Sequence, residues 1–157
     1  MVQAAQFPSK ILTSTESLII RAWRIIVSGR TGCRHLRQAF GSPDGVEILE
    51  CSAHFLKELS HGSRRTLCVG DLSSQKITCD ERQMLTLLAA SQANCHALLR
   101  CHLDWLVKSN HHVNVTNAAH SLGRLLMQQS RHITIPATNA GRGSAVLEVV
   151  REKNYAR

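Results

Sequence analysis

The stretch from Thr78 to Val107 constrains the fold more than any other part of the chain, because its pattern is that of buried helix. Thr78-Cys79-Asp80-Glu81 fits a capping box, in which the threonine hydroxyl accepts from one free backbone N–H and the glutamate reaches back to another. Residues 84–90 are apolar nearly all round, which is typical of a helix surrounded by others. Since one helix of about thirty residues is long for a domain of this size, we predict two helices with a break near Asn94.

Further segments show apolar residues three and four positions apart, which is the spacing of one helix face. Serine, threonine or asparagine near several of their starts would cap free backbone N–H groups, and glycine would end a helix. On this pattern we expect helices over residues 15–28, 31–40, 45–60 and about 116–129.

The core must be built mainly from aliphatic side chains, because aromatic residues make up only 4% of the chain. That composition suits helices better than a β-sandwich. The periodicity fails over residues 64–76, where 66–69 has the length of a short strand that could pair with 133–135 or 146–150. We predict an all-α fold, a small bundle of about four to six helices, with one short β element as the alternative for this region.

Turn-forming residues divide the chain at 41–45, where glycine, serine, proline and aspartate come together. Before this point, residues 1–42 form a basic amphipathic segment whose helices we expect at the periphery. Residues 43–136 form the predicted helical core domain, and residues 137–157 have the composition of a linker and a charged tail. A chain of 157 residues can bury such a core without help from a metal or a disulfide.

The positive charge of the chain lies mainly at its N-terminal end. The formal net charge is +8, and residues 1–42 hold six cationic side chains against the single acid Glu16. Such a segment is attracted to nucleic acid, anionic lipid or an acidic protein by the same Coulomb term. Arginine suits phosphate because its guanidinium can donate two parallel hydrogen bonds. The candidate nucleic-acid-binding residues are Arg21, Arg24, Arg30, Arg34 and Arg37.

Two other interpretations of these arginines stay open. They could form the solvated polar face of an amphipathic helix that has no ligand. Alternatively, Trp23 and the isoleucines around it could place the same helix at a membrane surface or against a partner helix. A cluster of charge does not select among these partners.

The cysteines are expected to be free thiols in a reducing compartment. The apolar run 18–27 is interrupted by Arg21 and Arg24, so we expect no signal peptide, and no apolar stretch is long enough to span a bilayer. Several cysteines also lie in periodic apolar segments, where a reduced cysteine acts as a small hydrophobic residue. We therefore predict a cytoplasmic protein. The cysteines are Cys33, Cys51, Cys68, Cys79, Cys95 and Cys101.

The pairs Cys95-His96 and Cys101-His102 are the strongest candidates for metal chemistry, and their spacing argues against it. Zinc needs four ligands that converge at about 2.3 Å or less from one point. Positions six apart on a helix are rotated by about 240°, and Cys95 and His102, which share a face, lie about 10 Å apart along the axis. We predict no metal site and no cofactor. No phosphate-binding, dinucleotide, nucleophile-elbow or zinc-protease motif occurs, so we predict no catalytic residues and no enzyme.

The sequence therefore favours a small non-enzymatic regulator or adaptor that acts by protein contact, with a protein partner or a second copy of itself. The alternative is a nucleic-acid-associated regulator that uses the N-terminal arginines. An enzyme with a thiol or metal centre is the third hypothesis.

Overall fold

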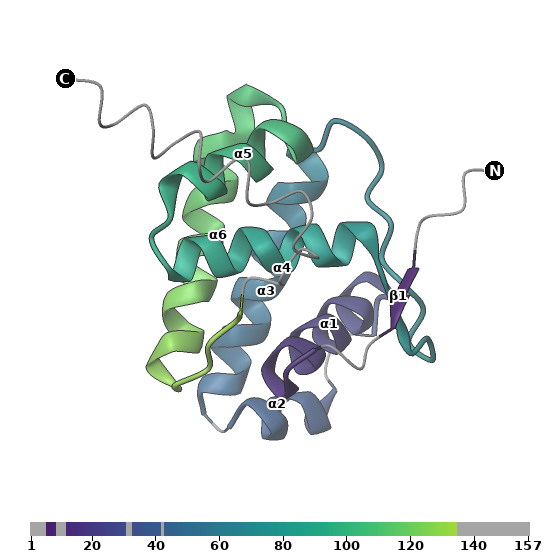
Figure 1. The fold of residues 1–157 in the computed structure, drawn as a ribbon. Coiled ribbons are helices and arrows are strands. Elements are labelled where there is room, and N and C mark those ends of the chain that lie inside the picture. The colour runs from purple at the N-terminus through teal and green to yellow at the C-terminus, as the bar shows by residue number, and fades with distance from the viewer. Residues whose placement is uncertain (1–5, 9–11, 31–32, 42, 135–157) are drawn as a thin grey trace.

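The computed structural model describes residues 6–8, 12–30, 33–41 and 43–134 (Figure 1). Within these ranges the chain forms six α-helices, one 3-10 turn and two short strands, which confirms the predicted small helical bundle. The helices are α1 (Ser14–Val27), α2 (Arg34–Phe40), α3 (Asp44–Gly62), α4 (Cys79–Gln92), α5 (His96–Leu106) and α6 (His112–Gln128). The 3-10 turn η2 (Ser109–His111) joins α5 to α6.

Helix α4 lies at the centre of the bundle and packs against both α5 and α6 (Figure 1). Its capping box forms as predicted, since Thr78 Oγ1 accepts from the backbone N–H of Glu81 and Glu81 accepts from that of Thr78. Every residue from 84 to 91 is buried. The chain leaves the helix through Asn94, whose φ of 50° lies in the left-handed region that asparagine tolerates better than most residues. The predicted break between α4 and α5 is therefore confirmed.

Helices α1 and α2 belong to the core and are not peripheral attachments. Ile19, Ile20 and Trp23 of α1 and Phe40 of α2 are buried in the same hydrophobic cluster as α4. The Trp23 ring packs on Phe55 of α3, with 5.8 Å between the ring centroids. The expectation of a peripheral position for these helices was wrong, because their apolar faces fill the space beside α3 and α4.

The β element lies elsewhere than predicted. Residues 66–69 form no strand. Instead, β2 (Lys76–Thr78) pairs antiparallel with β1 (Gln6–Pro8), in a segment where the sequence shows no pattern. Pairing between segments about seventy residues apart depends on the tertiary fold, and short runs carry too little local signal to reveal it.

Some of the predicted segments lie in parts of the chain that the structure does not describe. The predicted linker and tail at 137–157 lie outside the described residues, as does the strand considered at 146–150. Among the described helices, none combines the length and apolar character that crossing a membrane requires.

Candidate functional site

The five arginines that we singled out fall into two groups. Arg21, Arg30, Arg34 and Arg37 are exposed, and their side chains make no hydrogen bond or ion pair with any residue that the structure describes. Arg24 is different: only 6% of its surface is exposed. We therefore remove Arg24 from the candidate phosphate-contacting set.

All five N–H donors of Arg24 have partners within the protein. Nε and Nη2 donate to the two carboxylate oxygens of Glu81, at 2.7 and 2.9 Å. Nη1 donates to the backbone carbonyls of Asp71 and Ser74, and Nη2 also donates to that of Lys76. Because a guanidinium has only five donors, Arg24 has none left for a ligand.

Glu81 is equally saturated and is completely buried. Besides the guanidinium of Arg24, it accepts from the backbone N–H groups of Gly70 and Thr78. The pair thus joins α1 to the start of α4 and fixes the loop that leads from α3 into α4. A buried charge pair persists when the geometry is good and the remaining polar atoms are satisfied, and both conditions hold here. The role of Arg24 is structural.

The preceding residue, Asp80, fixes the other end of the same loop. Its carboxylate accepts from both Nη atoms of Arg65 and from the backbone N–H of Cys68. Burial alone would raise the pKa of Asp80, but the hydrogen bonds from Arg65 and Cys68 and the charge of Arg65 outweigh it, so the pKa lies below its usual value. The ionised form of Asp80 is therefore favoured by folding.

The lowered pKa of Asp80 predicts a loss of stability in acid. A carboxylate whose pKa is lower in the folded state stabilises the fold above its unfolded pKa of about 4, and loses this contribution as the pH falls through the folded value. We expect the difference in unfolding free energy between the wild type and Asp80→Asn to shrink steadily below about pH 4. Urea unfolding between pH 7 and pH 2.5 measures it, with Asp104→Asn, which is exposed, as the control. A difference that is independent of pH would contradict the prediction.

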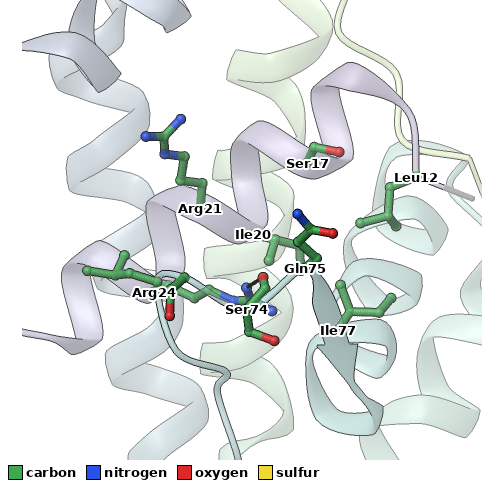
Figure 2. Close-up of a pocket in the computed structure, with 10 residues that line it drawn as sticks. Leu12, Ser17, Ile20, Arg21, Arg24, Ser74, Gln75 and Ile77 are labelled. Carbon is green, nitrogen blue, oxygen red and sulfur yellow. Dashed lines mark hydrogen bonds between the residues drawn. The ribbon is translucent and has the colours of Figure 1, made fainter. Parts of the chain in front are cut away.

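A groove of about 280 Å³ runs between α1 and the 72–77 segment (Figure 2). Figure 2 shows Arg24 reaching toward Ser74, whereas Arg21 points away from it. The lining is mixed, with Ile20 and Ile77 beside serine and glutamine side chains, and contains no carboxylate. Arg24 shapes this groove, and Arg21 lies at its edge without an ion pair to any residue in the described ranges.

The outward side of α5 carries the most exposed aromatic residue among those whose burial the structure describes. Trp105 is 67% exposed, whereas Trp23 is completely buried. Ala97, Arg100, Cys101 and Asp104 are exposed on the same helix, and with Trp105 we call them the α5 face. Helical periodicity already separates Trp105 from Leu99, Leu103 and Leu106, the buried residues of α5, so the signal was present in the sequence and we did not use it.

The cysteines and histidines do not assemble into a site. Cys95 and Cys101 are exposed, as is Cys68, and the other cysteines are half-buried. Cys95 and Cys101 lie in a periodic apolar segment, and the expectation that they belong to the core was wrong. His102 lies half-buried beside Gln83, and burial lowers its pKa. Among the described residues, no group of three His, Cys, Asp or Glu side chains could hold a metal ion.

One serine–histidine contact has the appearance of catalytic machinery. Ser91 Oγ lies 2.8 Å from Nδ1 of His120, and such a pair can activate a nucleophile when a third group orients the base. Within the described part of the chain no carboxylate contacts His120. Ser91 itself is 3% exposed. The contact joins α4 to α6 and satisfies a buried hydroxyl.

No protein-family model, curated protein or solved structure matches this chain.

Proposed function

We propose that this protein is a small non-enzymatic regulator or adaptor that acts by protein contact, and that the α5 face is its contact surface. The observation that carries the proposal is the exposure of Trp105. Tryptophan is among the residues most enriched in the energetic centres of protein interfaces. Its large apolar ring contributes more than any other side chain when a partner removes it from water.

The surroundings of Trp105 support an interface centre. Ala97 and Cys101 are small and lie on the same side of α5, so a partner can approach the helix closely. A second exposed apolar residue, Val113, lies at the start of α6 and is 69% exposed. The start of α6 lies beside the end of α5, since His112 Nδ1 is 3.8 Å from the Asp104 carboxylate. The start of α6, with the exposed Val113, therefore lies close to the end of α5.

We expect Trp105→Ala to weaken binding of the partner by about thirtyfold or more, because an alanine at such a centre typically costs at least about 2 kcal/mol. The test is capture of partners from a lysate of the source cell by immobilised wild-type and variant protein, followed by mass spectrometry. Met127→Ala is the matched control, since Met127 is also an exposed apolar residue but lies at the far end of α6.

The same capture experiment, run with and without nuclease, distinguishes this proposal from the nucleic-acid alternative. A protein that is retained after nuclease treatment and is lost with Trp105→Ala supports the α5 face. Material that disappears with nuclease, and is lost when Arg21, Arg30, Arg34 and Arg37 all become glutamine, overturns the adaptor proposal in favour of phosphate contacts. Arg24 is left intact in that variant because its loss would disturb the fold.

A further inference from the structure

The α5 face has an arrangement that is complementary to itself. At about 100° per residue, the side of α5 opposite the buried leucines is centred between Ala97 and Cys101. Trp105 lies on one flank of this centre line, and Arg100 and Asp104 lie together on the other. Along the axis, Ala97 and Trp105 lie about 6 Å on either side of Cys101.

From this arrangement we propose that the partner of the α5 face is a second copy of the chain, bound by antiparallel pairing of the two α5 helices about Cys101. The inference rests on the proposed function, because it names the partner of that surface. A two-fold axis perpendicular to both helices sets Cys101 against Cys101. It then places Trp105 of each chain opposite Ala97 of the other, a large side chain against a small one.

The charges agree with the same pairing. The two-fold axis keeps the flank with Arg100 and Asp104 on the same side in both chains. Arg100 of one chain then lies about 3 Å along the axis from Asp104 of the other, and the contact occurs twice. A parallel pair would instead set these charged residues against the flank that carries Trp105. Opposite charges placed this way select the orientation of a helix pair.

The small area of the α5 face limits the expected affinity of the dimer. Helix α5 has 11 residues, so a pair of them buries less than the roughly 1,200 Å² of a standard interface. We therefore expect a dimer that forms with rising concentration, with a dissociation constant on the order of tens of micromolar. Sedimentation velocity from about 1 to 300 µM measures it.

Charge exchange is the decisive test, because both residues are exposed. Arg100→Asp sets two carboxylates together at each contact, and we expect it to weaken the dimer about tenfold. Asp104→Arg should do the same, and the double variant Arg100→Asp/Asp104→Arg should restore the wild-type constant. Trp105→Ala should weaken the dimer at least about thirtyfold. Far-ultraviolet circular dichroism verifies that each variant keeps its helices.

Cys101 reports directly whether the two α5 faces meet. With the helix axes about 9 Å apart, the two Cys101 Cα atoms would lie roughly 5 Å apart, within the range of a disulfide. Diamide, which takes up the two electrons and two protons released by two thiols, should therefore link the chains in the wild type and in Cys95→Ser but not in Cys101→Ser. Cys95 would lie about 18 Å along the axis from its counterpart in this pair, and it is rotated by about 120° from Cys101, away from the α5 face.

The antiparallel dimer and the wider proposal that the α5 face binds a partner can fail independently of each other. A chain that stays monomeric to 300 µM, while another protein binds it through Trp105, overturns the inference and leaves the proposed function standing. A dimer that ignores the charge exchange, or a disulfide between Cys95 residues, overturns the antiparallel arrangement. Rescue by the double charge exchange, together with a link through Cys101, supports it.

Discussion

Arg24→Met is expected to lower the free energy of unfolding by about 3–5 kcal/mol, which is the typical cost of removing one partner from a buried charge pair. Glu81 would remain fully buried with its charge unpaired. The backbone carbonyls of Asp71, Ser74 and Lys76 would lose the donors that hold them. Methionine fills much of the space but donates no hydrogen bond, so packing is retained while the polar contacts are lost.

Thermal and urea unfolding measure the effect, which corresponds to a fall of about 10 °C or more in Tm. Arg21→Met is the matched control, since Arg21 lies one turn earlier on α1 and is exposed; we expect it to change the unfolding free energy by less than about 0.5 kcal/mol. The double variant Arg24→Met/Glu81→Leu should recover part of the loss, because it removes the stranded charge. Equal effects of the two single arginine variants would show that the buried pair contributes nothing.

Phe55→Ala is expected to lower the free energy of unfolding by about 3–5 kcal/mol, because it removes a large side chain from the core. Phe55 is completely buried, and its ring packs on Trp23, with 5.8 Å between the ring centroids. It lies on α3, which packs against α1, α2 and α6. The cavity would open beside the Trp23 ring, in the hydrophobic cluster that these helices share.

Val46→Ala provides the comparison on the same helix, because Val46 is 45% exposed and its truncation leaves no cavity. We expect it to cost less than about 0.5 kcal/mol. Urea unfolding followed by the fluorescence of Trp23 and Trp105 measures both variants. If Phe55→Ala cost no more than Val46→Ala, the contact between α1 and α3 would not contribute to the core.

Local sequence patterns were sufficient to predict where the main helices lie. The capping box at Thr78 and the apolar run after it marked the start and the central position of α4, because both depend on residues within a few positions of each other. The break at Asn94 followed from helix length. The outward position of Trp105 was also contained in the helical period of α5, although the period alone does not tell whether another of the described helices covers that side.

The sequence by itself determined which segments are helical and which faces are apolar, since these properties repeat at the spacing of a single helix. Only the tertiary structure decided what each arginine does. Arg21 and Arg24 lie three positions apart and have the same side chain, yet Arg24 meets a glutamate 57 positions away while Arg21 stays in solvent. The pairing of β1 with β2 was decided in the same way. Such contacts depend on how separate helices pack, and no local pattern records that arrangement.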